Sequence, residues 1–143
     1  MKCLSVRQPW ASLIIAGVKR CENRTWLVKH RGPLAIHAAA GIDGRGWHQV
    51  FDSVGVVPPD HSVTLDDGTE LPPWRDLPRG KILGAVEVID CVRWEDLPAD
   101  LMADPLAIGP WCWVLADPRP LATPFRCPGR LGLWAPPAGL RLP

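Results

Sequence analysis

In residues 4–26, LSVRQPWASLIIAGVKRCENRTW, a short apolar segment runs directly into a cluster of charges. Pro9 suits the first turn of a helix, where its missing N–H costs nothing. Apolar side chains then repeat at the spacing of one buried helical face, and Gly17 is typical of a helix end. The side chains on that face are Leu13, Ile14 and Val18. The stretch therefore predicts one short helix that leads into a charged segment.

The charged segment combines residue types that bind anions. Lys19 offers a compact ammonium group, and Arg24 offers a planar fork that can grip a phosphate or a carboxylate with two hydrogen bonds. Glu22 lies between them in the sequence, and two neighbouring cations would hold it ionised. In that state it can accept hydrogen bonds from a nucleobase or orient the two cations. The alternative interpretation is a surface ion-pair cluster without function.

Four further residues of this stretch are candidate ligand contacts. Ser5 and Gln8 approach the N-terminus of the predicted helix, whose unpaired N–H groups favour anions, and simple helix capping is the equal alternative. Trp10 and Trp26 could stack on a base, although burial is expected for at least one of them. His37 lies in a later apolar segment, and we expect a core histidine there rather than a catalytic base.

The charge of the chain is unevenly distributed. The formal net charge of the whole chain is +1. Up to His37, however, the chain carries seven basic residues and one acidic residue, whereas the remainder carries nine basic and fourteen acidic residues. Such a split is a recognised hint of a polyanionic partner. The positive field falls on the same part of the chain as the charged cluster, and this favours a nucleic acid as the ligand.

Composition excludes several other classes of protein. With 143 residues, 47% of them hydrophobic and 22% charged, the chain predicts a single ordered globular domain. No apolar run approaches the roughly 20 residues of a membrane span, and no secretory signal pattern is present, so the expected location is the cytoplasm. Five cysteines without a Cys-x-x-Cys pair predict neither a disulfide framework nor a zinc site, and we expect no cofactor. Cys3, Cys91 and Cys112 are expected to be buried.

The rest of the chain predicts a fold dominated by β-strands. Short β-favouring segments recur between Gly and Pro turns, whereas helical patterning is confined to residues 47–54 and a turn at 95–101. The predicted strands are 23–28, 34–39, 82–92, 111–115 and 121–126, with a turn at 117–120. Gly84 marks a bulge or a close approach by another backbone. Residues 55–79, rich in Pro and Asp, predict an irregular insertion loop away from the charged cluster.

This order of elements favours an α+β, mainly β fold. A doubly wound sheet would need a helix after nearly every strand, and the sequence does not provide them. We therefore expect a closed or nearly closed β-barrel of five to six strands with short flanking helices, in one domain spanning residues 1–143. A groove would form where the first helix leaves the barrel.

The charged segment also resembles a known family. Residues 17–24, GVKRCENR, fit the pattern Gly-x-Lys-x-x-Glu-x-Arg of the ASCH domain, and residues 5–12, SVRQPWAS, resemble the segment that precedes it. Further similar segments are 30–39 (HRGPLAIHAA), 84–91 (GAVEVIDC), 109–116 (GPWCWVLA) and 129–134 (GRLGLW). The resemblance implies a PUA-like β-barrel and a nucleic-acid partner, with Lys19, Glu22 and Arg24 lining the ligand cleft.

Two functions remain open from the sequence. One is a binding module for RNA, another nucleic acid or a modified nucleotide. The other is a metal-independent hydrolase, a ribonuclease or a modified-nucleoside amidohydrolase, in which Lys19 and Glu22 would be catalytic. Some small members of the family are hydrolases with a Lys-x-x-Thr arrangement, but here the third residue after Lys19 is Glu22, so that nucleophile is absent. Protein partners are not predicted.

Overall fold

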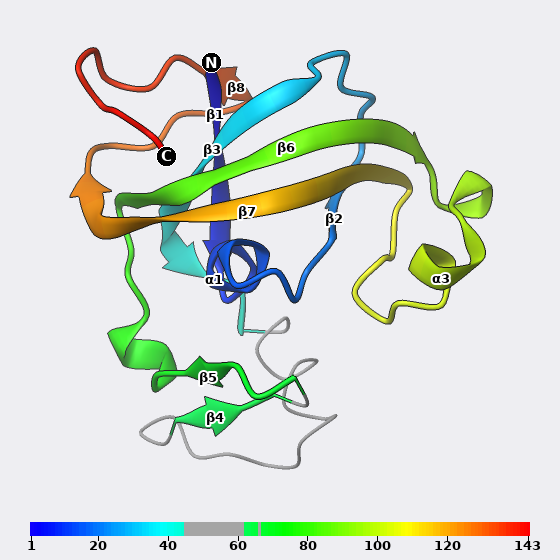
Figure 1. Cartoon of the computed structure of the whole chain (residues 1–143), viewed down its shortest axis with the longest axis horizontal. Helices are drawn as coiled ribbons and strands as arrows, with labels where there is room; N and C mark the ends of the chain where they lie inside the picture. The colour runs from blue at the N-terminus through cyan, green and yellow to red at the C-terminus, as the bar shows by residue number, and fades with distance from the viewer. Residues whose placement is uncertain (45–61, 66) are drawn as a thin grey trace.

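The fold is a strongly curved sheet of six strands with short helices at its margins (Figure 1). A computed structural model of the chain describes residues 1–44, 62–65 and 67–143. The elements in chain order are β1 (Lys2–Gln8), α1 (Trp10–Ile15), β2 (Cys21–Arg24), β3 (Gly32–Ile42), β4 (Val63–Thr64), β5 (Glu70–Leu71), η1 (Trp74–Asp76), β6 (Lys81–Arg93), η2 (Trp94–Asp96), α3 (Ala99–Met102), β7 (Trp111–Arg126) and β8 (Leu133–Trp134). No helix among the described residues is long and apolar enough to cross a membrane.

The strand order makes the sheet a nearly closed barrel. Its six strands run in the order β2-β7-β6-β3-β1-β8, with β1 and β3 parallel and the other neighbours antiparallel. The edge strands β2 and β8 are not hydrogen-bonded to each other, so a gap remains. The expected mainly β fold with short flanking helices is therefore confirmed.

The core lies inside this curved sheet and is filled from alternate strand positions, as the twofold side-chain period of a strand requires. On β1, Leu4 and Val6 point inward, whereas Arg7 is exposed. The other side chains of this core include Leu34, Ile36, Ala38, Val86, Val88, Trp113, Leu115 and, from α1, Ala11 and Ile14. Burying one such aliphatic side chain contributes about 1.5–3 kcal/mol. These contacts fasten α1 to the barrel.

The first helix agrees with its sequence signals. Gly17 has a φ of +80°, which suits glycine after a helix end, and Leu13 and Ile14 are buried. Pro9 occupies the cap position one residue before the helix rather than its first turn. The side chain of Gln8 accepts a hydrogen bond from the backbone N–H of Ser12, with 3.0 Å between the nitrogen and oxygen atoms. Gln8 thereby stabilises the start of α1.

Strand β7 corrects one prediction. The sequence predicts two strands with a turn at residues 117–120, but the structure has a single strand from Trp111 to Arg126. The irregularity is real, since Asp117 has a φ of +51° and the pairing with β6 changes register on both sides of Arg119. Strand β6 runs uninterrupted beside this segment. The extra residues of β7 therefore bulge out of the ladder instead of reversing the chain.

The second and third strands also differ from their predicted bounds. The strand predicted at 23–28 is Cys21–Arg24, and its last residue, Arg24, pairs with Trp111, the first residue of β7. Strand β3 extends past the predicted 34–39 to Gly32–Ile42 because β6 and β1 pair with it on its two sides. In both cases the partner strand sets the length.

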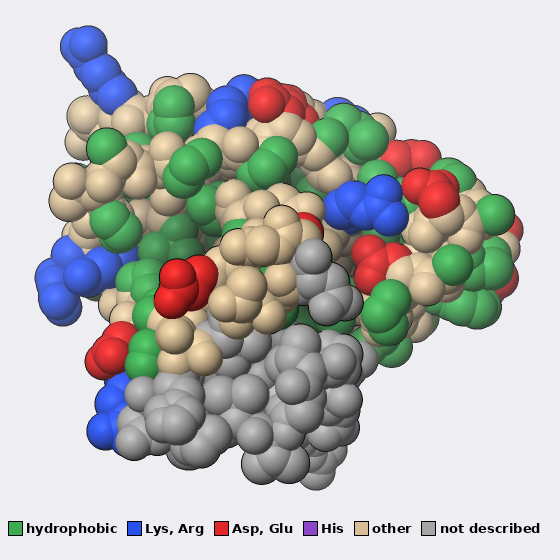
Figure 2. All heavy atoms as spheres, turned by 60° about the horizontal axis from the view of Figure 1, so that its bottom comes forward, with side chains coloured by type: hydrophobic (Ala, Val, Ile, Leu, Met, Phe, Trp, Pro, Cys, Tyr) green, Lys and Arg blue, Asp and Glu red, His purple; other side chains and the backbone are tan. Residues whose placement is uncertain are grey.

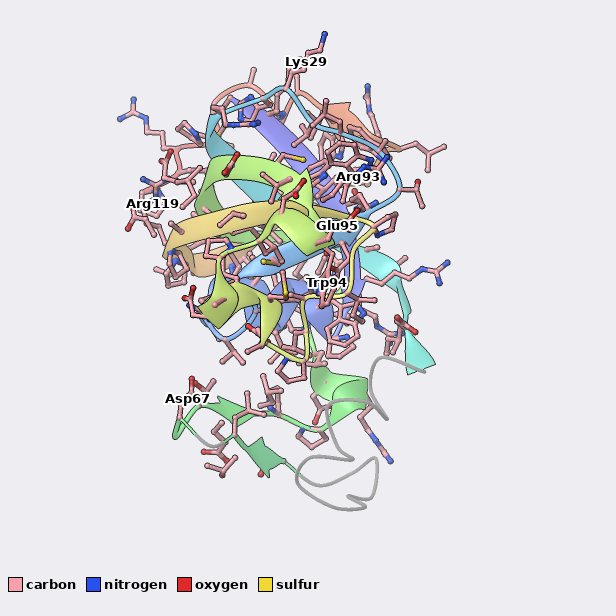
Figure 3. The ribbon with its side chains drawn as sticks, turned by 90° about the vertical axis from the view of Figure 1, so that its right-hand side faces the viewer. Lys29, Asp67, Arg93, Trp94, Glu95 and Arg119 are labelled. Carbon is pink, nitrogen blue, oxygen red and sulfur yellow. The ribbon has the colours of Figure 1, made fainter. Side chains whose placement is uncertain are left out.

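The predicted insertion is largely irregular where it is described. Residues 62–79 contain a two-stranded hairpin of β4 and β5 and the short η1 turn. The helix predicted at 47–54 lies outside the described residues. The predicted turn at 95–101 is confirmed as η2 and α3. In Figure 3 the hairpin that carries Asp67 lies at the opposite end of the molecule from Lys29.

All five cysteines are free and buried, and this confirms the prediction for Cys3, Cys91 and Cys112. Desolvation raises the pKa of the Cys3 thiol to about 12 and that of Cys21 to about 11. Proximity to Cys127 adds to the shift at Cys3. These cysteines therefore stay protonated at neutral pH and act as small apolar side chains.

Candidate functional site

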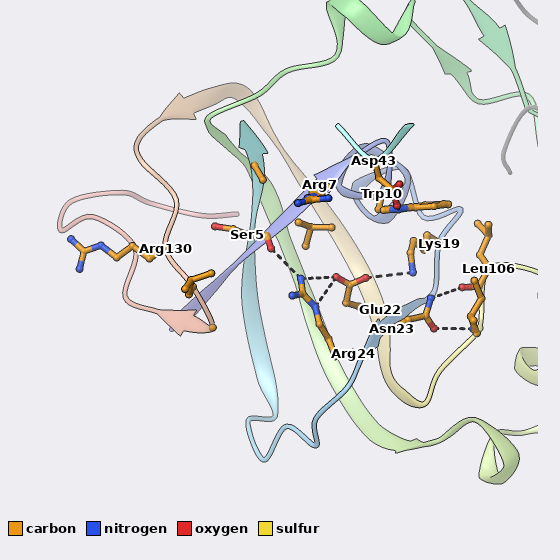
Figure 4. A pocket seen from close by; sticks show the side chains of 15 residues that line it. Ser5, Arg7, Trp10, Lys19, Glu22, Asn23, Arg24, Asp43, Leu106 and Arg130 are labelled. Carbon is orange, nitrogen blue, oxygen red and sulfur yellow. Dashed lines mark hydrogen bonds and ion pairs between the residues drawn. The ribbon is translucent and has the colours of Figure 1, made fainter. Parts of the chain in front are cut away.

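A pocket of about 530 Å³ opens between β1 and β2, two strands that are not paired with each other (Figure 4). Its wall also includes Trp10 of α1, the loop before β7 and the loop between β7 and β8. Four basic and two acidic side chains line it, namely Arg7, Lys19, Arg24, Arg130, Glu22 and Asp43. The gap in the barrel is therefore a positively charged recess.

Lys19, Glu22 and Arg24 form a continuous chain of charges in this pocket. The Lys19 ammonium lies 3.5 Å from one carboxylate oxygen of Glu22. Arg24 donates to the other oxygen through Nη2 at 2.9 Å and through Nε at 3.2 Å. The Lys19 and Glu22 side chains are only 3% and 8% exposed, whereas Arg24 is 28% exposed. Both carboxylate oxygens thus receive a cation before any ligand binds, and the carboxylate fixes where the two cations sit.

Arg24 also connects the two sides of the open barrel. Its Nη2 donates to the backbone carbonyl of Ser5 on β1 at 3.1 Å, while the residue itself belongs to β2. Figure 4 shows this as one line of contacts from Lys19 through Glu22 and Arg24 to Ser5. Because hydrogen bonds to charged groups are stronger than neutral ones, this line stabilises the pocket where the backbone ladder is missing.

The remaining predicted ligand contacts divide into two groups. Ser5 and Trp10 line the pocket together with the charged chain. The Lys19 ammonium lies 5.7 Å from the centre of the Trp10 ring, and the Trp10 indole donates to Asp43 at 2.9 Å. Gln8 is fully buried and bonded within the protein, and Trp26 packs edge-to-face on Trp113 outside the pocket. The structure brings five of the seven predicted contacts together.

His37 is a buried histidine with both ring nitrogens engaged. Its Nε2 lies 2.8 Å from the carbonyl of Cys127, so this nitrogen carries the proton and donates. Its Nδ1 then accepts from the hydroxyl of Ser5 at 3.1 Å. Trp134 in turn donates to that hydroxyl at 3.3 Å. The expectation of a core histidine is confirmed, and the ring holds the chain after β7 against β1 and β3.

Asn23 was not singled out from the sequence, yet it shapes one wall of the pocket. Its amide oxygen accepts from the backbone N–H groups of Ile108 and Gly109, both at 2.9 Å. Its amide nitrogen donates to the carbonyl of Leu106 at 2.9 Å. The loop before β7 is thereby fastened to the strand that carries Glu22 and Arg24. Because this pairing joins residues more than 80 positions apart, no local pattern indicates it.

Trp94 holds the same loop from the other side. Its indole donates to the carbonyl of Ala107 at 2.9 Å. A side chain added at Gly109 would lie 2.9 Å from the Cβ atom of Trp94, so only glycine fits there. Figure 3 shows Trp94 below its neighbours in the chain, Arg93 and Glu95. The apolar wall of the pocket, Leu106 and Ile108, is therefore rigidly placed.

Two cations of the pocket have no counter-charge among the residues that the structure describes. Arg7 follows Ser5 by two positions on β1 and is exposed, and Arg130 is exposed in the loop between β7 and β8. Within residues 1–44, 62–65 and 67–143, neither forms an ion pair. Because side chains alternate between the two faces of a strand, Ser5 and Arg7 share a face, and the sequence could have indicated Arg7 as a pocket residue. Arg130 joins the pocket only through the tertiary fold.

Acidic side chains gather elsewhere on the molecule. In Figure 2 they are concentrated toward the end that carries η2 and α3. Residues Glu95, Asp96, Asp100 and Asp104 belong to this region, and the last two pair with Arg20. The basic residues of the N-terminal part are therefore divided between the pocket and the acidic end of the molecule. Arg7, Lys19 and Arg24 line the pocket, whereas Arg20 is neutralised by the acidic end.

The chain belongs to the ASCH domain family. The sequence profile of that family matches residues 4–125, which include the whole pocket apart from its β7–β8 loop. Among characterised proteins, the chain is similar to activating signal cointegrator 1 of Homo sapiens, with 30% identity over 135 residues, and of Mus musculus, with 29%. These alignments cover 92% of this chain but 22% of either relative, so the chain spans about a fifth of their length.

Proposed function

We propose that this protein binds RNA through the pocket between β1 and β2, with a nucleotide of the strand inside and the backbone phosphates on the surrounding cations. One observation carries the proposal. Four basic side chains converge on one recess, and two of them, Arg7 and Arg130, lack a counter-ion among the described residues. A phosphate supplies the missing negative charge, and arginine binds it with two parallel hydrogen bonds.

One wall of the pocket suits a base. The Trp10 ring and the apolar Leu106 and Ile108 line it together with Glu22 and Arg24. A base can lie against the apolar groups while its polar edge reaches the charged chain, and aromatic contacts tolerate different bases. A modified nucleotide within an RNA strand would enter the same space.

Binding accounts for the geometry better than hydrolysis does. A general base must accept a proton from the reacting group, but both oxygens of Glu22 already receive hydrogen bonds or charge from Lys19 and Arg24. The hydroxyl nearest to these charges in the sequence, that of Thr25, is not placed as a nucleophile either. Thr25 is exposed beyond the end of β2 and does not line the pocket. We therefore assign Glu22 an orienting role.

The test is a titration of a fluorescent single-stranded RNA at several salt concentrations. Each phosphate neutralised on a single strand adds about −0.7 to the slope of log K against log salt. Arg7→Gln should flatten the slope by about this amount because Arg7 is exposed and lines the pocket. Lys29→Gln, an exposed control that lines no part of the pocket, should leave it unchanged. Equal effects of the two substitutions would contradict binding at this pocket.

A further inference from the structure

The loop between β7 and β8 presents an exposed leucine from a firmly held backbone. Leu131 is 99% exposed and therefore packs against almost nothing in the protein. The loop is fastened on one side by the Cys127 carbonyl, which accepts from His37, and on the other by Leu133, which pairs with β1. An apolar side chain that a fixed loop holds in water gains no free energy from burial. A ligand that covers the side chain would gain that free energy on binding.

The close packing of Gly129 adds to this rigidity. A Cβ atom at Gly129 would lie 2.7 Å from the hydroxyl oxygen of Ser5 and 2.8 Å from a ring carbon of His37. The loop backbone therefore lies directly on β1 and β3 at this point. Arg130 and Leu131 follow immediately and project from this contact as an adjacent cationic and apolar pair.

This pair stands between two hollows. The first is the pocket described above, and the second is a more open hollow of about 500 Å³ on the other side of the loop. Both hollows are lined by Ser5, Ala39, Arg130 and Leu131. The second continues over His37, Gly80 and Pro128, and none of its described lining residues is acidic. In Figure 4 Arg130 lies beyond Ser5 from Lys19, at the outer side of the first pocket.

We infer that Leu131 is a wedge between two consecutive bases of a single-stranded RNA, with one nucleotide in each hollow and the linking phosphate on Arg130. Apolar side chains that insert between bases are an established means of separating a base step. An arginine next to the wedge is well suited to the phosphate that joins the two separated nucleotides. This inference rests on the proposed RNA binding and adds to it that the ligand unit is at least a dinucleotide.

If Leu131 is a wedge, the affinity for RNA depends on the bases, whereas binding by charge alone depends only on the phosphates. The probes are fluorescent oligouridylate of eight nucleotides and an oligomer with the same number of phosphates but no bases. Leu131→Ser should weaken binding of oligouridylate about five- to tenfold, as expected for loss of a partly buried leucine contact. Its affinity for the base-free oligomer and its salt slope should not change. Because Leu131 packs against almost nothing, the variant should remain folded.

Matched controls separate the wedge from general effects. Leu27→Ser removes a leucine that is 46% exposed and lines neither hollow, and it should leave both affinities unchanged. Arg130→Gln should flatten the salt slope by about 0.7. Arg126→Gln removes another exposed arginine, which lines neither hollow, and should have a smaller effect. A uridine dinucleotide should bind more tightly than uridine monophosphate in wild type but not in Leu131→Ser.

The outcomes for the wedge and for RNA binding are distinct. If oligouridylate binds with a salt slope that Arg7→Gln flattens, yet Leu131→Ser binds it like wild type, RNA binding stands and the wedge is wrong. Equal wild-type affinity for the base-free oligomer and for oligouridylate also overturns the wedge. If neither oligomer binds at low salt, the proposed function itself fails, and the wedge fails with it.

Discussion

Replacing Glu22 by Gln tests whether burial makes the Lys19–Glu22–Arg24 chain stabilising. The substitution retains the shape of the side chain but removes its charge, so the ammonium of Lys19, which is 3% exposed, loses its carboxylate. Breaking a buried ion pair costs about 3–5 kcal/mol. The amide oxygen of glutamine still accepts from Arg24, so we expect a loss of about 2–3 kcal/mol. For a domain of this length that lowers the unfolding temperature by about 5–10 °C.

The matched control is Glu87→Gln, the same substitution at another arginine pair. Glu87 accepts from Arg119 at 2.8 Å, but both side chains are 27% exposed. Because the Glu87 side chain reaches solvent far more than that of Glu22, we expect a contribution of about 1 kcal/mol or less, as for solvent-accessible pairs, and the unfolding temperature should change by less than about 3 °C. Thermal and urea unfolding of the two variants measure the difference. Equal losses at Glu22 and Glu87 would refute the argument from burial.

The same variant separates an orienting carboxylate from a catalytic one. Removing a negative charge by itself should strengthen binding of a polyanion. A fall in RNA affinity for Glu22→Gln therefore reports lost orientation of Lys19 and Arg24, and this is the result we expect. RNA and an acylated nucleoside, the substrates of the two hydrolase alternatives, are then incubated with wild type and Glu22→Gln without metal ions. Turnover by wild type that vanishes in the variant, with affinity unchanged, would establish the hydrolase and refute our assignment.

Gly84→Ala should destabilise the protein by about 3 kcal/mol in urea unfolding, because a Cβ atom there would lie 2.3 Å from the carbonyl oxygen of Arg119. Full stability would show that the backbone approach is not this close. Asn23→Ala should accelerate hydrogen exchange at the amides of Ile108 and Gly109, since both lose their acceptor; unchanged exchange would contradict the fastening of this loop. Cys3 should resist Ellman's reagent at pH 8 until the protein unfolds, because a thiol with a pKa of about 12 is ionised in only about one molecule in ten thousand at that pH. Rapid labelling of the native protein at Cys3 would contradict its burial.

Local sequence signals determined the elements whose causes lie within a few residues. Gly17 after the apolar face of Leu13 and Ile14 specified the end of α1, since a positive φ and a helical face are properties of a single segment. The strand predicted at 82–92 agrees with β6 within one residue at each end. The spacing of Lys19, Glu22 and Arg24 likewise predicted a charge cluster that the structure shows as one connected chain.

Tertiary contacts set where strands end and which distant residues join the pocket. Strand β2 ends at Arg24 because its partner begins at Trp111, and β7 remains one strand across three prolines because β6 continues beside it. Asn23 bonds to the loop before β7, and Arg130 and Leu131 line the same pocket as residues of β1, in each case across separations of more than 80 residues. The charged half of the site could be predicted from the local sequence, since neighbours along the chain are neighbours in space. The rest depends on closure of the barrel, because strand pairing brings together segments whose local sequences carry no information about each other.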